Sequence, residues 1–314
     1  MRCTPALAIL FSLWTLTCAA FRPGVAAWDE PQPSSGPGQS LTVPGLSHLY
    51  KLDNRLYSGG TPEGIEGLES LKKLGVATII RVDGARPDVA AIQKLGLRIV
   101  HLPIGYDGIS ADQSARLVRA VQESSGPVFI HCHHGQHRGP AAAALLARAE
   151  LGWSQTVANQ WLLQVGTSNR YPGLYQSGCR ANLPGPEELA HVKPEDLPET
   201  ARVPDLVERM VEIDTLHDQL KKNLVAGRNE AAHDPTRKAQ LLLEALQEAS
   251  RAESMSQPNP QKKREFGQRT SETISAIEQL IKALGTEKPH PDRISDSLAN
   301  IGKSCSACHA AMRD

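Results

Sequence analysis

The strongest constraint on the fold is a change of hydrophobic pattern partway along the 314-residue chain. In the first half, β-branched apolar runs at 76–82, 97–104 and 127–131 alternate with helical spacing at 88–95, at 111–123 and after 140. Upstream, LYKLDNRLYSGG has two short strand-like runs around Asp53 and Asn54, as expected of a hairpin. Strands alternating with helices predict an α/β domain, a mainly parallel sheet flanked by helices, over residues 46–179.

The pattern changes after residue 180. Residues 180–202 are rich in proline and have no sustained apolar period, so they are expected to form a linker between two domains. From residue 203 onward the apolar spacing is helical only, in four successive stretches. Four amphipathic helices with short connections predict an all-α four-helix bundle over 203–314.

The N-terminal segment has the composition of an export signal. Residues 1–27 combine Arg2 with a short apolar stretch and small residues before a cleavage point at Ala27, with cleavage after Ala20 as the alternative. The sequence therefore predicts a signal peptide, a periplasmic or other extracytoplasmic location in a bacterium, and no membrane span after cleavage. Residues 28–45, rich in Pro, Gly and Ser, are expected to be a flexible linker.

Composition limits the partners of the chain. Its 34 basic residues balance its 34 acidic residues, which argues against a nucleic-acid binder. Without the signal peptide, the remaining cysteines are Cys132, Cys179, Cys305 and Cys308. Four thiols are too few for a disulfide scaffold in a chain of this length, so each needs its own explanation.

The sequence IHCHHGQHRGP at 130–140 predicts an anion-binding loop. Cys132 follows a buried strand, and Arg138 precedes a helix that Pro140 is expected to open. Gly135 lets backbone N–H groups converge on one anion, and the helix N-terminus adds partial positive charge. Arg138 offers a bidentate fork for phosphate, and the same surroundings favour a nucleophilic thiolate at Cys132. The residues of this phosphate-binding loop are His133, His134, Gly135, Gln136, His137 and Arg138.

A metal site built from histidines is the alternative interpretation of this segment. It would use His131, His133, His134 and His137. Adjacent histidines point apart in an extended loop, and the carboxylates that usually orient histidine ligands are absent nearby in the sequence. The anion-binding loop is therefore favoured, with His131 at the strand end and the other three histidines at the rim of the pocket.

The first half resembles the cysteine-dependent phosphatases of the dual-specificity and tyrosine phosphatase superfamily. The resemblance spans about 48–178 and rests on HCHHGQHR and on LYSGGTPEGIEGLESLKKLGVATII at 56–80. It implies a phosphorylated protein or small molecule as substrate, attack on phosphorus by Cys132, and phosphate binding by Arg138. Gly139 departs from the family, in which Ser or Thr follows the arginine and assists release of the thiolate. Turnover of the phosphocysteine is the step that this departure affects.

The family also uses an aspartate on a separate loop to protonate the leaving oxygen. Asp112 has another explanation, because Ser110 and Gln113 predict a capping box that places it in the first turn of a helix. Asp107 lies in the loop sequence GYDG and has no such role. Asp107 is therefore the expected general acid.

The chain ends in a second motif, in which Cys305, Cys308 and His309 have the C-x-x-C-H spacing of covalent haem attachment. The two thiols can bond the haem vinyl groups while the imidazole coordinates the iron. A thioredoxin-like pair needs a βαβ setting, and a structural zinc site needs more ligands. Both thiols continue the apolar helical spacing of 294–312, which predicts one haem c per chain in the bundle core.

This part resembles cytochrome c′, whose haem motif also ends the fourth helix of a bundle. The resemblance covers about 203–314 and rests on IGKSCSACHAAMR. It implies His309 as an axial ligand of the iron, and Met210 is the candidate sixth ligand, with core packing as its alternative. His217 lies two turns further along. A redox partner or a small gaseous ligand at the haem is also implied, and two chains are expected to associate through the bundle.

Together the motifs predict an exported two-domain haemoprotein that hydrolyses phosphoric monoesters. The alternative is an electron-transfer or gas-binding cytochrome whose phosphate-binding domain does not turn over. Cys179 belongs to neither motif. A disulfide with Cys132 would protect the nucleophile and link it to redox state, whereas a buried, idle thiol is the simpler expectation.

Overall fold

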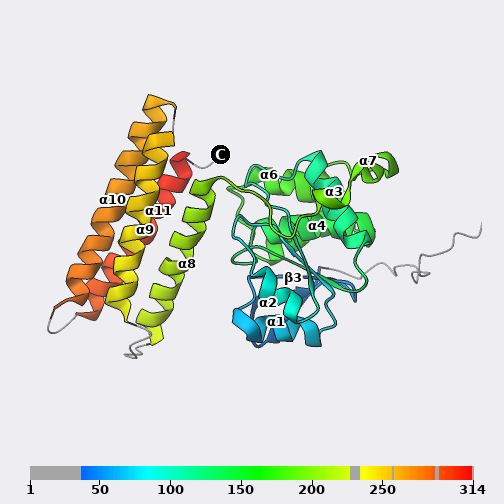
Figure 1. The fold of residues 1–314 in the computed structure, drawn as a ribbon, viewed down its shortest axis with the longest axis horizontal. Coiled ribbons are helices and arrows are strands. Elements are labelled where there is room, and N and C mark those ends of the chain that lie inside the picture. The colour runs from blue at the N-terminus through cyan, green and yellow to red at the C-terminus, as the bar shows by residue number, and fades with distance from the viewer. Residues whose placement is uncertain (1–36, 227–233, 257, 287–289, 313–314) are drawn as a thin grey trace, which may run out of the picture. The chain divides into compact units, whose positions relative to one another are not determined.

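The computed structural model describes residues 37–226, 234–256, 258–286 and 290–312. The predicted signal peptide lies outside these residues. Strands and helices alternate in the first part of the described chain, and only helices follow (Figure 1). The predicted fold class, an α/β part followed by a helical bundle, is confirmed. Among the described residues, no helix combines the length and the apolar character needed to cross a membrane.

A mixed sheet forms the centre of the first part, and its strand order is β1-β2-β3-β6-β4-β5 in the described chain. β6 pairs in parallel with β3 on one side and with β4 on the other, and β5 continues the parallel set. β2 pairs antiparallel with β1 on one side and with β3 on the other, and β2 and β3 form the predicted hairpin. The strands are β1 (Gln39–Val43), β2 (Leu46–Lys51), β3 (Leu56–Gly59), β4 (Thr78–Arg81), β5 (Arg98–His101) and β6 (Val128–His131).

Helices cover both faces of the sheet, α1 and α2 one face and α3 and α4 the other (Figure 1). Successive side chains of a strand point to opposite faces, so each face has its own apolar core. Ile79, Ile99 and Phe129 pack with α1 and α2, and Ile80, Val100 and Ile130 pack with α3 and α4. The helices of this part are α1 (Gly64–Lys73), α2 (Val89–Lys94), α3 (Ala111–Gln122), α4 (Arg138–Glu150), α5 (Gln155–Gln164) and α6 (Pro172–Tyr175), followed by a π-helical turn, η1 (Gln176–Arg180).

The helix after the anion-binding loop begins earlier than the sequence predicts. Pro140 was expected at its first position, but α4 begins at Arg138 and Pro140 is its third residue. Proline is tolerated there because the first turn of a helix has N–H groups without intrahelical partners. The carbonyl of Pro140 accepts a hydrogen bond from the indole N–H of buried Trp161, at 3.0 Å. Arg138 therefore lies in the first turn of α4.

Two segments predicted as linkers contain ordered structure. Within 28–45, residues Gln39–Val43 form β1, because their backbone groups pair with β2. Within 180–202 lie α7 (Pro186–His191) and a 3₁₀ turn, η2 (Pro194–Asp196). The carbonyl of Pro198 accepts from the His101 N–H at 2.8 Å, and the Ala201 N–H donates to His101 Nδ1 at 3.1 Å. The proline-rich segment therefore packs along the end of β5, since proline carbonyls still accept hydrogen bonds.

The second part is the predicted four-helix bundle. Its helices are α8 (Asp205–Ala226), α9 (Pro235–Ser256), α10 (Pro260–Leu284) and α11 (Pro291–Met312). Three of them begin with proline, whose missing N–H is not needed at a first helical position. All four contribute to one apolar core, formed by Ile213, Leu220, Ala239, Leu242, Leu246, Ala249, Ile277, Leu280 and Ile301.

Candidate active site

The loop between β6 and α4 brings Cys132 and Arg138 together. Cys132 follows the last residue of β6 and is 3% exposed, and Arg138 is the first residue of α4. Gly139 lies so close to the cysteine that a Cβ there would be 3.4 Å from Cys132 Sγ and 2.9 Å from its backbone nitrogen. The loop therefore sets the thiol beside the helix N-terminus and the guanidinium.

Close backbone packing fixes the shape of this loop. Gly135 has a φ of +70°, and a Cβ there would meet the backbone of Gly59 and Gly60 at 2.5 Å. The Thr61 N–H donates to the carbonyl of His133 at 3.0 Å. On the other side, the Thr167 hydroxyl donates to the carbonyl of Gln136 at 2.6 Å. Only glycine fits at 135, and the loop is tied to its surroundings on both sides.

A buried carboxylate, which the sequence analysis missed, lies near the loop. Asp83 is fully buried, and its Oδ1 accepts from Arg81 Nε at 2.7 Å and from the Ala85 N–H at 2.9 Å. Burial alone would raise the pKa of Asp83, but the charge of Arg81, its hydrogen bond to the carboxylate and the charge of Arg138 hold that pKa below its ordinary value. Asp83 is therefore an anion that balances positive charge around the loop. Its sequence signal is weak: an aspartate one residue after a buried strand.

His131 ends β6, as the sequence predicts, and is buried. Burial, together with the nearby charge of Arg81, lowers the pKa of His131 to about 3. Its imidazole is therefore neutral at physiological pH. His131 fills the core beneath the loop and adds no positive charge to the site.

Aromatic rings form a wall beside Arg138. The guanidinium carbon of Arg138 is 4.5 Å from the centre of the Tyr106 ring. Tyr171 contacts Tyr106 at 4.4 Å and His137 at 5.1 Å between ring centres. Burial lowers the pKa of Arg138, but Tyr106, Cys132 and Asp83 together raise that pKa above its ordinary value. Neither Tyr106 nor Tyr171 was predicted from the sequence, although Tyr106 precedes Asp107 in the same loop.

The two candidate general acids have different surroundings. Asp107 is exposed and follows Tyr106, whose ring contacts Arg138, so its loop borders the phosphate-binding loop. Asp112 is in the first turn of α3 and its carboxylate pairs with Arg116 Nε at 2.9 Å. The predicted capping box between Ser110 and Gln113 is present. These surroundings favour Asp107 as the candidate general acid, because the carboxylate of Asp112 already pairs with an arginine of its own helix.

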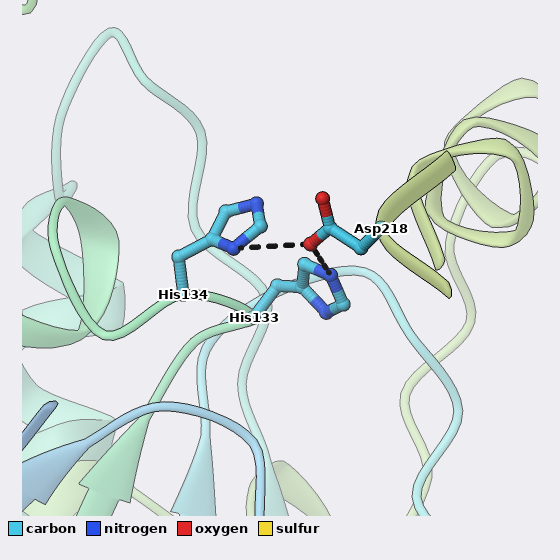
Figure 2. Close-up of side chains that lie close together, drawn as sticks. All are labelled: His133, His134 and Asp218. Carbon is cyan, nitrogen blue, oxygen red and sulfur yellow. Dashed lines mark ion pairs between the residues drawn. The ribbon is translucent and has the colours of Figure 1, made fainter. Parts of the chain in front are cut away.

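The four histidines of the motif do not assemble into one site. His131 is buried in the core, and His137 packs on Tyr171. His133 and His134 lie together, with ring centres 4.4 Å apart. Figure 2 shows that both rings face Asp218 of α8. The carboxylate that is absent nearby in the sequence comes from a helix about 80 residues further along the chain.

The residues of the second motif lie on α11. Cys305 packs against the bundle core, as does Met210 from α8, whereas His309 is exposed. Burial raises the pKa of Cys305 to about 11 and also raises the pKa of Cys308. Both thiols are therefore protonated at neutral pH. Two half-buried thiols followed by an imidazole on one helix fit the donor set of a covalent haem.

His217 lies two turns after Met210 on α8. Its Nε2 is buried without a hydrogen-bond partner, and burial, with the charge of Lys221, lowers its pKa. The imidazole is therefore neutral at physiological pH.

Cys179 lies in the π-helical turn and is 1% exposed. Burial raises its pKa to about 11. Cys132 and Cys179 are both free thiols, so the structure contains the buried thiol and not the disulfide. Cys179 is therefore protonated at neutral pH and is a poor nucleophile.

Replacing Gly139 by Ala is expected to lower the free energy of unfolding of the first part by about 1–3 kcal/mol, because the added Cβ would displace the Cys132 backbone. Urea unfolding followed through the emission of buried Trp153 and Trp161 measures this. Gly267→Ala in α10 is the control, since a Cβ there meets nothing within 4 Å and the residue lies in the helical bundle, away from both tryptophans in the sequence. An unchanged unfolding midpoint in Gly139→Ala would contradict the close contact.

Comparison with known proteins finds similarity in part of the chain. No family model matches it. It is 28% identical over 134 residues to the dual specificity protein phosphatase TpbA of Pseudomonas aeruginosa strain UCBPP-PA14, covering 41% of this chain and 60% of the relative. The TpbA of strain PAO1 is 26% identical over 133 residues, covering 41% of this chain and 59% of the relative. The chain thus spans about three fifths of the length of the curated relatives it matches.

Solved structures match a similar share of the chain. The crystal structure of P. aeruginosa TpbA has a TM-score of 0.42 at 22% identity, covering 48% of this chain and 94% of the other. A TpbA variant in complex with pTyr has a TM-score of 0.42 at 21% identity, and the match covers 48% of this chain and 93% of the variant. The catalytic domain of the PP-IP phosphatase SIW14 of S. cerevisiae has a TM-score of 0.36 at 15% identity, with 40% and 79% covered. Over about two fifths of its length, the chain is similar to dual-specificity protein phosphatases.

Proposed function

We propose that the first part of the chain hydrolyses phosphoric monoesters through a cysteinyl-phosphate intermediate. The observation that carries this proposal is the placement of Cys132 at the end of the central strand β6 and of Arg138 at the start of α4, at the two ends of one tight loop. The similarity to dual-specificity protein phosphatases supports it. The substrate would be a phosphorylated protein or small molecule.

Each step of the reaction has a residue suited to it. The Arg138 fork binds two phosphate oxygens, and the N–H groups of the loop and of the first turn of α4 bind the others. Cys132 Sγ attacks phosphorus and the ester oxygen leaves with a proton from Asp107. Asp107 then removes a proton from a water molecule that attacks the phosphocysteine, and the thiolate leaves as inorganic phosphate forms.

Gly139 bears on the last of these steps. No hydroxyl at 139 assists the departing thiolate, and the spacing to Cys132 leaves no room for a Cβ without a backbone shift. Stabilisation of the thiolate then depends on Arg138 and on the helix N-terminus. The same observation favours the alternative function, in which the loop binds phosphate without turnover.

Replacing the two central residues tests the reaction. Cys132→Ser is expected to lower kcat/KM for an aryl phosphate by about 10³-fold or more, because the nucleophile is lost. Arg138→Lys is expected to lower kcat/KM by about 10²–10³-fold, since an ammonium does not reproduce the bidentate fork. Arg119→Lys, on the surface of α3, is the matched control. Release of phosphate by Cys132→Ser at the rate of the unchanged chain would exclude this mechanism.

The two aspartates separate the candidate acids. Asp107→Asn is expected to lower kcat by about 10²–10⁴-fold, because an amide donates no proton to the leaving oxygen. Asp112→Asn should leave kcat nearly unchanged, because its carboxylate pairs with Arg116. Rates measured from pH 5 to 9 decide between them. A larger loss in Asp112→Asn would assign the acid to α3.

We also propose that the bundle carries one haem c. Cys305 and Cys308 would bond it, His309 would coordinate the iron, and Met210 is the candidate for the sixth ligand. The half-buried thiols and the position of Cys305 and Met210 against one core support this. A haem there would supply one-electron transfer to a redox partner or the binding of a small gaseous ligand. Attachment of this kind requires export, so a periplasmic location is part of the proposal, as is association of two chains through the bundle.

The haem proposal has its own test. Cys305→Ala combined with Cys308→Ala is expected to abolish the haem that stays with the polypeptide after acid–acetone extraction, because both thioether bonds are lost. A pyridine haem spectrum of the extracted protein measures this. Cys179→Ala is the matched control, because Cys179 lies in the first part of the chain. Haem retained by the double variant would refute covalent attachment.

A further inference from the structure

Two loop histidines and one aspartate of α8 converge on a small volume. Asp218 Oδ2 is 3.6 Å from His133 Nε2 and 3.5 Å from His134 Nδ1 (Figure 2). The three possible ligand atoms all lie within 4.8 Å of one another. Ligands bonded at about 2.0–2.2 Å to a tetrahedral ion lie about 3.3–3.6 Å apart. The two distances from Asp218 are therefore close to those between ligands that share one ion.

The groups around this cluster orient its members. Lys221 Nζ binds Asp218 Oδ1 at 2.7 Å, which leaves Oδ2 facing the two imidazoles. Asp214 Oδ2 is 3.3 Å from His134 Nε2, the ring nitrogen that does not face Asp218. A carboxylate that accepts from the second nitrogen of a histidine is the usual support of a metal ligand, because it fixes the tautomer and the direction of the ring.

Two further ion pairs join α8 to the first part of the chain. Arg86 Nε pairs with Glu208 Oε1 at 2.7 Å, before the cluster in the sequence of α8. Lys222 Nζ pairs with Glu63 Oε1 at 2.9 Å, after the cluster. The loop and α8 also belong to one compact unit of the chain. The two ion pairs lie on either side of the cluster along the helix, and they join α8 to the first part of the chain as the cluster does.

We propose that His133, His134 and Asp218 bind one divalent cation of the zinc class, with Asp214 orienting His134. Two imidazoles and one carboxylate suit zinc better than magnesium or calcium, which prefer oxygen ligands. Three protein ligands leave a fourth position for water. His133 and His134 directly follow Cys132, so the cation would tie the phosphate-binding loop to the helical bundle. The cation would bind the side chains of two residues of the phosphate-binding loop, whereas phosphate would be bound by the backbone N–H groups of that loop and by Arg138.

Zinc binding by the full chain tests the site. The parent protein carries Cys305→Ser and Cys308→Ser, so that the thiols of the second motif supply no ligands. After treatment with EDTA and exposure to zinc, gel filtration and elemental analysis should find one zinc per chain. Asp214→Asn is expected to lower the affinity for zinc by about 10–100-fold, because it removes the group that orients His134. His134→Ala and Asp218→Asn each remove a ligand, so each should lower the affinity further. Glu212→Gln, an exposed residue of the same helix, is the control and should bind as the parent does.

Cobalt as a probe reports the ligand type. Co²⁺ in the parent protein should give the visible bands of a tetrahedral nitrogen and oxygen site without thiolate charge-transfer absorption. Far-UV circular dichroism of each variant verifies that its helices are intact. Absence of zinc from the parent would mean that the cluster is only a set of ion pairs, and the proposal would be wrong. Equal binding by folded Asp218→Asn, or a thiolate band, would also overturn it.

Discussion

The parallel pairing of β6 with β3 and β4 is the interaction on which the candidate active site depends. It makes β6 an inner strand of the sheet, with Phe129 and Ile130 buried on opposite faces. Parallel strands end at the same edge of a sheet, which is where ligands bind in such folds. Cys132 therefore follows β6 at the edge where β3 and β4 also end, and α4 begins a few residues later, at Arg138.

Around that edge, close packing and buried charge determine the shape of the loop. Gly135 contacts the end of β3 so closely that no side chain fits, and Gly139 has the same relation to Cys132. Asp83 is buried with Arg81 and balances the charge of Arg138. A buried charge without such a partner would cost several kcal/mol. The site is thus maintained by groups that do not contact a substrate.

The helical bundle contributes to the surroundings of the loop as well as to the second motif. α8 has one side on the bundle core through Ile213 and Leu220, and it presents Asp214 and Asp218 to His133 and His134. The same helix carries Met210, which packs on the core with Cys305. A single helix therefore connects the surroundings of the phosphate-binding loop with those of the haem motif. This offers a physical reason for joining the two parts in one chain.

Local signals in the sequence determined most of the architecture. The hydrophobic pattern predicted the strands from β2 to β6 and the four helices of the bundle, because burial of one face or of both faces of an element determines the spacing of its apolar residues. Motif spacing singled out Cys132, Arg138, Cys305 and Cys308, since each of the two motifs lies within one short segment of the chain. Only the tertiary structure decided that 39–43 extends the sheet, that Tyr106 stacks on Arg138, and that Asp218 reaches the loop histidines. These contacts join residues far apart in the chain, and no local pattern records which distant partner a polar side chain or an edge strand will meet.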